Sequence, residues 1–189
     1  MKQESIPLTE RERLKGTETE KNLMSAFIGE SQARNKYTYF ASVAKREGYE
    51  QISAFFTETA DNEKEHAKIW FDILGGVLDT KDNLTSGMEG EEYEFEEMYP
   101  EFARVAEEEG FPILAQKFKM VAEIERHHYN RYKKLLENMI NDEVFKKKTG
   151  VHVWKCRNCG NIITSSKAPE ICPVCMHPKA YYEINCENY

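Results

Sequence analysis

The stretch Glu58-Thr-Ala-Asp-Asn-Glu-Lys-Glu-His-Ala67 decides how this chain is expected to fold. Within it, Glu63 and His66 are three residues apart in a helical pattern, so their side chains lie one turn apart on the same helix face. The other positions of that face are Ile52, Phe56, Thr59, Trp70 and Ile73. An ionised glutamate in such a core row is costly without a positive partner. A metal ion bound by Glu63 and His66 would supply that partner.

A second Glu-x-x-His pair, Glu125 and His128, lies in another helical pattern near the end of the acidic part of the chain. The apolar positions of that pattern are Leu114, Phe118, Val121, Tyr132, Leu135 and Met139. Glu30 occupies a core position in a third pattern. One such pair alone is more often ordinary solvated charge. Two pairs on core faces, with Glu30 on a third helix, favour a metal site inside a helical bundle.

Four amphipathic helices are predicted, over residues of about 17–47, 51–74, 91–109 and 112–139. Pro100 is expected to kink the third helix or to mark its effective start, because proline lacks an amide donor. Residues 1–16 are expected to be a frayed arm, and residues 77–89 the long crossover between two helical hairpins. This arrangement predicts an all-α, ferritin-like four-helix bundle with one long crossover.

In the third helix the expected ligands are Glu91 and Glu94. The surrounding run is rich in acid, so three register-shifted alternatives stay open: Glu92, Glu96 and, as the main rival, Glu97. Carboxylates and two imidazoles at one level suit two divalent cations with bridging glutamates. Oxygen ligands with some imidazole favour iron or manganese.

Two tyrosines are candidates for a supporting role at this centre. Tyr37 and Tyr99 each follow a predicted ligand and could donate hydrogen bonds to ligand carboxylates. Buried tyrosines in a bundle also serve simply as packing residues, so both interpretations are kept. His127 points about 100° away from His128 around the helix and is expected either at the surface or as a supporting residue beside the ligands.

All five cysteines come after residue 155, and four of them form two C-x-x-C pairs twelve residues apart: Cys156 and Cys159, then Cys172 and Cys175. This spacing predicts one tetrahedral metal site. Spacing alone does not choose between structural zinc and a redox-active iron, since both accept four thiolates. Disulfides are disfavoured in a chain without a secretion signal, and Cys186 has no evident partner.

A change of composition predicts two domains. Residues 146–150 are a plausible linker, so the expected division is a helical domain over 1–148 and a small four-cysteine domain over 149–189. The small domain is too short to bury a sufficient core and needs the metal for stability. The chain has a net charge of −7 and no basic block, which makes nucleic acid a poor partner. With no apolar run of membrane length and no signal peptide, a cytoplasmic protein without a membrane partner is expected.

These residues resemble the rubrerythrin family over nearly the whole chain. The matching pieces are Gly29-Glu-Ser-Gln-Ala-Arg-Asn-Lys-Tyr37, Glu58 to Ala67, Glu94-Phe-Glu-Glu-Met-Tyr-Pro100 and the Cys156 to Cys175 pairs. The resemblance implies a di-iron site with the ligands Glu30, Glu63, Glu91, Glu94, Glu125 and His128. It also implies that His66 exchanges with Glu94 as one iron changes oxidation state, and that Tyr37 and Tyr99 support the ligands.

For the four cysteines the resemblance implies a rubredoxin-type iron, so that a chain carries three iron ions, with zinc substitution possible. It further implies a homodimer in which the four-cysteine iron of one subunit lies near the di-iron site of the other. The expected activity is reduction of hydrogen peroxide to water in oxidative stress defence. The electrons would come from an external NAD(P)H-dependent reductase or a rubredoxin, since the chain has no G-x-G-x-x-G nucleotide motif.

Two other functions remain as alternatives. A ferritin-like ferroxidase or iron-handling protein would use the same bundle, but it needs no four-cysteine electron donor. A binding protein with structural zinc at the cysteines would not need costly inward-facing carboxylates.

Overall fold

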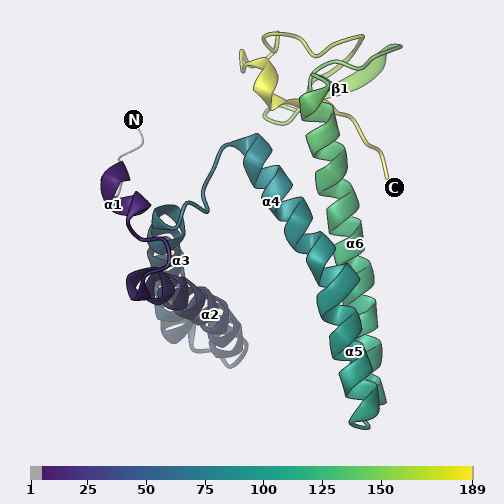
Figure 1. Ribbon diagram of the computed structural model, residues 1–189. Coiled ribbons are helices and arrows are strands. Elements are labelled where there is room, and N and C mark those ends of the chain that lie inside the picture. Colours follow the sequence, from purple (N-terminus) through teal and green to yellow (C-terminus); the bar gives the residue numbers. More distant parts are fainter. Residues whose placement is uncertain (1–5, 189) are drawn as a thin grey trace. The chain divides into compact units, whose positions relative to one another are not determined.

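The computed structural model describes residues 6–188, and these are mostly helical, with a small strand domain near the C-terminus (Figure 1). The helical elements are α1 (Leu8–Glu12), α2 (Glu18–Arg46), α3 (Glu50–Ile73), α4 (Thr80–Tyr93), the π-helical turn η1 (Glu94–Met98), α5 (Tyr99–Glu108) and α6 (Pro112–Ile140). They are followed by β1 (His152–Cys156), β2 (Ile162–Ser165), the 3-10 turn η2 (Lys179–Tyr181) and β3 (Tyr182–Ile184). None of the helices in the described range is long and apolar enough to cross a membrane.

The chain forms two compact units, one ending at Leu78 and the other beginning at Asp79. The first unit is built on the α2–α3 hairpin. Helix α2 begins at Thr17, whose hydroxyl accepts a hydrogen bond from the Glu20 amide at 3.1 Å. The two helices pack through small buried residues, among them Ala41 and Ala60. The Ser53 hydroxyl donates a hydrogen bond to the Ala41 carbonyl at 2.9 Å and ties the helices together.

The expectation of a frayed arm over residues 1–16 was wrong for its second half. Residues Leu8–Glu12 form the short helix α1. A weak ion pair between Arg11 and Asp72, at 3.6 Å, joins this helix to the end of α3. The first five residues lie outside the described range.

The prediction of a long crossover over residues 77–89 was also wrong for most of that range. Residues 80–89 are helical, so the segment that joins α3 to α4 is only Leu74–Asp79. Asp79 caps α4, because its carboxylate accepts a hydrogen bond from the Asp82 amide at 2.9 Å. Gly87 brings α4 close to α6: a Cβ at this position would lie 3.4 Å from the Tyr132 ring. Capping and close packing thus make a helix of a segment whose composition suggested a loop.

The second unit contains a hairpin of α4, η1 and α5 packed against α6, and its packing repeats that of the α2–α3 hairpin. The rings of Tyr37, Phe40 and Phe56 form a cluster with centroid separations of 6.2, 6.1 and 5.6 Å. The rings of Tyr99, Phe102 and Phe118 form the corresponding cluster, with separations of 6.2, 6.2 and 5.7 Å. The turns match too, since Gly48 and Gly110 end the first helix of each hairpin with φ of +87° and +84°.

The C-terminal part of the second unit is a three-stranded antiparallel sheet in the order β2-β1-β3. Its core contains Trp154, Cys156, Ala168, Cys172 and Tyr182, and Phe145 packs against it. The Ala168 amide also donates a hydrogen bond to the Phe145 carbonyl at 2.8 Å, and the backbones of Lys146 and Lys167 form an isolated antiparallel β-bridge. The segment after α6 is therefore attached to the small sheet. The domain boundary between residues 148 and 149 stays a prediction.

We expect Gly110→Ala to lower the free energy of unfolding by roughly 1 kcal/mol, because its positive φ is unfavourable for a residue with a Cβ. Urea unfolding of the metal-free protein followed by circular dichroism measures this change. The matched control is Gly29→Ala inside α2, where a Cβ meets nothing within 4 Å. The control should not destabilise the protein. Equal losses at both positions would show that the turn geometry is not the cause.

Candidate metal centres

The first cluster consists of Glu30 on α2 with Glu63 and His66 on α3. One ligand atom from each of these side chains lies within 4.8 Å of the others. The His66 Nδ1 atom is 2.8 Å from a carboxylate oxygen of Glu63, as expected for residues one helical turn apart. Glu30 and Glu63 are half-buried. Three of the predicted ligands are thus brought together by one hairpin.

The second cluster consists of Glu91 on α4 with Glu125 and His128 on α6, and it has the same composition as the first. The His128 Nδ1 atom lies 2.7 Å from an oxygen of Glu125 and 3.6 Å from one of Glu91. Each hairpin therefore presents two carboxylates and one imidazole whose ligand atoms are close enough to hold one ion.

One carboxylate of each cluster, Glu30 in the first and Glu91 in the second, has a raised pKa and is costly to ionise. Burial raises the pKa of Glu30, and a hydrogen bond to Glu63 and the charge of Glu63 raise it further. Burial likewise raises the pKa of Glu91, as do a hydrogen bond to Glu125 and its charge. A divalent cation removes this cost because it attracts both carboxylates at once. The donor set of carboxylate oxygen and imidazole nitrogen fits iron or manganese.

Tyr99 lies near the second cluster. Its pKa is raised first by burial and then by the negative charges of Glu94, Glu125 and Glu91. A raised pKa keeps the phenol protonated, so Tyr99 can donate a hydrogen bond to a carboxylate. The structure places Tyr37 in the aromatic cluster of the first hairpin, with its ring centroid 6.1 Å from that of Phe56.

Glu94 is the predicted ligand that neither cluster contains, and it opens the π-helical turn η1. Its charge acts on both Glu91 and Tyr99, so it lies close to the second cluster. Glu94 is half-buried, whereas its three rivals Glu92, Glu96 and Glu97 are exposed. This difference in burial favours Glu94 among the alternatives.

The π turn compensates for one extra residue in the second hairpin. Glu30 and Tyr37 are seven residues apart, whereas Glu91 and Tyr99 are eight residues apart. In η1 the amide of Tyr99 donates to the Glu94 carbonyl, five residues back, which widens the helix by one residue. Glu91 and Tyr99 can then share a helix face as Glu30 and Tyr37 do. This turn was not predicted from the sequence, although the unequal spacing of the two Glu–Tyr pairs indicates it.

The four predicted cysteines form a third group, with sulfur atoms within 4.8 Å of one another. The Sγ–Sγ distances are 3.8 Å between Cys156 and Cys175 and 3.7 Å between Cys159 and Cys172. A hydrogen bond with the Tyr182 hydroxyl lowers the pKa of Cys172 to about 6, although burial opposes the shift. A lowered thiol pKa favours the thiolate that a metal ion requires.

The cysteines differ in exposure. Cys156 and Cys172 are buried, Cys175 is half-buried and Cys159 is exposed. The remaining cysteine, Cys186, is exposed and does not belong to the group. The metal position is thus covered on one side by the small core and open to solvent at Cys159.

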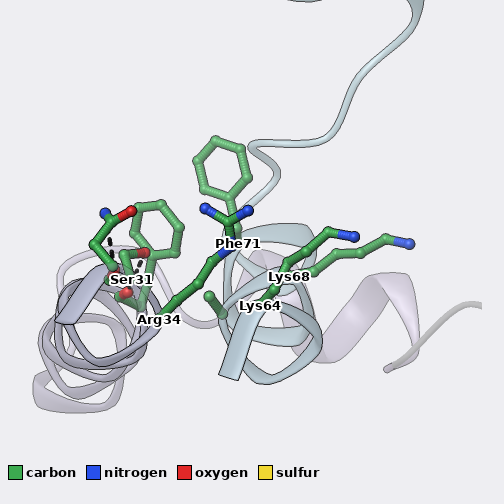
Figure 2. A pocket seen from close by; sticks show the side chains of 8 residues that line it. Ser31, Arg34, Lys64, Lys68 and Phe71 are labelled. Carbon is green, nitrogen blue, oxygen red and sulfur yellow. Dashed lines mark hydrogen bonds between the residues drawn. The ribbon is translucent and has the colours of Figure 1, made fainter. Parts of the chain in front are cut away.

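Figure 2 shows a groove of about 300 Å³ on the α2–α3 hairpin that does not include the first cluster. Its lining residues are Phe27, Ser31, Arg34, Asn35, Lys64, Ala67, Lys68 and Phe71. Lys64 directly follows Glu63, so the two side chains point about 100° apart around α3. None of the side chains that line the groove belongs to the first cluster.

Comparison with known proteins supports both metal sites. The family model described as Rubrerythrin matches residues 21–136, and the model described as Rubrerythrin, rubredoxin-like domain matches residues 154–183. The chain is 49% identical to the rubrerythrin of Porphyromonas gingivalis, covering 93% of this chain and 94% of that protein. It is 45% identical to the rubrerythrin of Nitratidesulfovibrio vulgaris, with coverages of 90% and 96%. It is 33% identical to nigerythrin of the same organism, with coverages of 85% and 83%.

Deleting Glu96 from the π turn should be tolerated by the fold, because it restores the seven-residue spacing of the first hairpin and leaves a regular α-helix. We expect unchanged helicity by circular dichroism but weaker iron binding, by about tenfold or more, because Glu94 loses its present position. The matched control deletes Gln32 from α2, which shortens a regular spacing and turns the following residues by about 100°. The proposed role of η1 is wrong if both deletions unfold the protein equally.

We expect Glu30→Gln to raise the melting temperature of the metal-free protein at pH 7 by a few degrees, because it removes a carboxylate with a raised pKa. For such a group the ionised form destabilises the fold above its folded-state pKa. Stability of the metal-free wild type should therefore increase as the pH falls through that pKa towards the ordinary value of 4.5. The variant should lack this contribution, whereas the exposed control Glu58→Gln should keep it. Calorimetry from pH 7 to pH 5 measures both.

Proposed function

The chain belongs to the rubrerythrin family, and on this premise we propose that it is a peroxidase that reduces hydrogen peroxide to water. Both metal sites of the family are represented in the chain, the di-iron site of Glu and His residues and the rubredoxin-like site of four cysteines. The observation that carries the proposal is this combination, since a relay site beside a di-iron site serves repeated electron transfer.

We assign six ligands to the di-iron site: Glu30, Glu63, Glu91, Glu94, Glu125 and His128. The two clusters are the two halves of this site, because each carries too few ligands for a di-iron centre on its own. His66 is the exchanging ligand and replaces Glu94 in the reduced state. A neutral imidazole suits the lower charge of the reduced centre, and an anionic carboxylate suits the higher charge of the oxidised one.

When bound, the two iron ions supply one electron each, and hydrogen peroxide with two electrons and two protons gives two molecules of water. The chain's own residues hold the ligands and handle the protons. The raised pKa of Tyr99 keeps a proton on its phenol oxygen beside Glu94 and Glu91. That hydroxyl fixes the orientation of a carboxylate and can pass a proton towards the site. Tyr37 has the corresponding position in the first hairpin and the corresponding assigned role.

The four cysteines would hold an iron ion that supplies the di-iron site with electrons one at a time. Cys159 is exposed, so an external donor can contact this side of the cysteine group. The donor in this proposal is an NAD(P)H-dependent reductase or a rubredoxin. The protein acts as a cytoplasmic homodimer in defence against oxidative stress. An iron-handling ferroxidase would use the same clusters, but it gives the cysteine site no task.

The test is a visible spectrum of the anaerobically reduced, iron-loaded protein before and after one equivalent of hydrogen peroxide. We expect rapid appearance of the ferric–thiolate colour, faster with peroxide than with dioxygen. Oxidation at the di-iron site without that colour would overturn the relay, and a faster reaction with dioxygen would favour the ferroxidase.

A variant separates the relay from the oxidation step. Cys159→Ser should still be oxidised once by peroxide, but steady-state turnover with a reductase should fall at least a hundredfold because electrons no longer return. The matched control is Cys186→Ser, which removes an exposed thiol outside the metal group and should keep full turnover. Unchanged turnover in Cys159→Ser would contradict the assigned route.

A further inference from the structure

We propose that each di-iron centre is assembled from two copies of this chain. One copy supplies the first cluster with its α2–α3 hairpin, and the other supplies the second cluster with its α4–α6 hairpin. This inference rests on the proposed function, in which both clusters serve one centre. The observation that supports the exchange is the short length of the segment between α3 and α4.

A ferritin-like bundle places a demanding requirement on that segment. Its second and third helices run in the same direction, so a long crossover must return the chain to the far end of the bundle. From Glu63 to the end of α3 at Ile73 the helix rises about 15 Å, for ten residues. From the start of α4 at Thr80 to Glu91 it rises about 16 Å, for eleven residues. With both clusters at one level, the crossover must therefore span about 30 Å.

The available connection is too short for this span. Seven Cα-to-Cα steps lead from Ile73 to Thr80, and they reach at most about 25 Å when fully extended. The first three residues of the connection do not extend, because Gly75 has a φ of +80°. The amides of Gly75 and Gly76 donate to the carbonyls of Asp72 and Phe71 at 3.0 and 2.8 Å.

Only the four steps from Gly76 to Thr80 remain for the crossover, and they reach about 14 Å. This is roughly half of the required span.

The first turns of α4 are not free to lengthen the connection. Asp79 caps the helix, and Gly87 lies in close contact with the Tyr132 ring of α6. Unwinding α4 as far as Gly87 would lose the cap and this helix contact together. The first turns of α4, which could otherwise lengthen the crossover, are thus part of the packed second hairpin.

A second copy removes the difficulty, because the connection then passes from one bundle into the next and need not turn back. Two copies exchange hairpins and form two complete centres. Apolar side chains on the cluster faces fit this assembly: Ile52 and Leu114 lie eleven residues before Glu63 and Glu125, on the same helix faces, and are 49% and 47% exposed. Such a pair of faces is covered when hairpins of two copies pack together.

Complementation between two defective chains tests the exchange. The first variant is Glu63→Ala with His66→Ala, and the second is Glu125→Ala with His128→Ala. The two chains carry different affinity tags, are produced together, and the mixed dimer is isolated by two purification steps. Iron bound per dimer is then measured by elemental analysis, with the four-cysteine iron as an internal standard that every sample retains.

With exchanged hairpins, the mixed dimer contains one centre with both clusters intact and one with neither. We therefore expect half of the wild-type content of di-iron-site iron in the mixed dimer, and close to none in either parental variant. Without exchange, every centre in the mixed dimer lacks one cluster. A mixed dimer as empty as its parents would overturn the inference, as would a wild-type monomer that holds its full iron.

Failure of the assigned di-iron site would look different, since wild-type protein would then hold only the four-cysteine iron, and failure of the peroxidase activity is seen in the spectrum with peroxide. A longer connection gives a second measurement. Inserting twelve Gly and Ser residues after Gly76 supplies the missing reach, so one chain can complete its own centre. With this insertion in both defective chains, the mixed dimer should hold no more di-iron-site iron than its parents. A chain that carries the insertion and no other change should keep its iron. If the mixed dimer still held more di-iron-site iron than its parents, the short connection would not be the cause of the exchange.

Discussion

Repulsion between carboxylates held side by side is the constraint on which the rest of this structure depends. The pKa values of Glu30 and Glu91 are raised because each lies half-buried beside another glutamate. Helices keep these side chains in place, so the chain cannot relieve the repulsion by moving them apart. A cation relieves it instead, and metal binding and folding stability are then two measures of one interaction. By the same reasoning, the clusters should weaken the protein when they hold no metal.

The repeated hairpin shows how one packing solution is used twice. Both hairpins bury alanines between helices, both end their first helix with a left-handed glycine, and both pack three aromatic rings together. The second hairpin departs from the first at η1, where an added residue brings Glu94 close to the second cluster. In the proposed function Glu94 is a seventh ligand side chain, and two identical halves would offer no place for it.

Sequence reasoning identified the features that depend on local spacing. The three-residue separation of Glu63 and His66 and the paired C-x-x-C motifs fix geometry over one turn, and the structure places both sets of side chains together. The start of α4 was missed because residues 77–89 contain Gly87 together with Asp, Asn and Ser residues and show little periodicity. Its stability comes from the Asp79 cap and from contact with Tyr132, 45 residues further along the chain. Helix propensity carries no information about that contact.

The attachment of Phe145 to the small sheet has a consequence for kinetics. Only a few residues separate the end of α6 from Phe145, and the Glu143 amide is itself bonded to the Asn138 carbonyl at 2.6 Å. The four-cysteine group is therefore held on a short, stiff arm and does not sample a large volume. In the proposed function, the supply of electrons would then be limited by the encounter with a soluble donor, which depends on concentration and ionic strength, and not by diffusion of the four-cysteine module on its own tether.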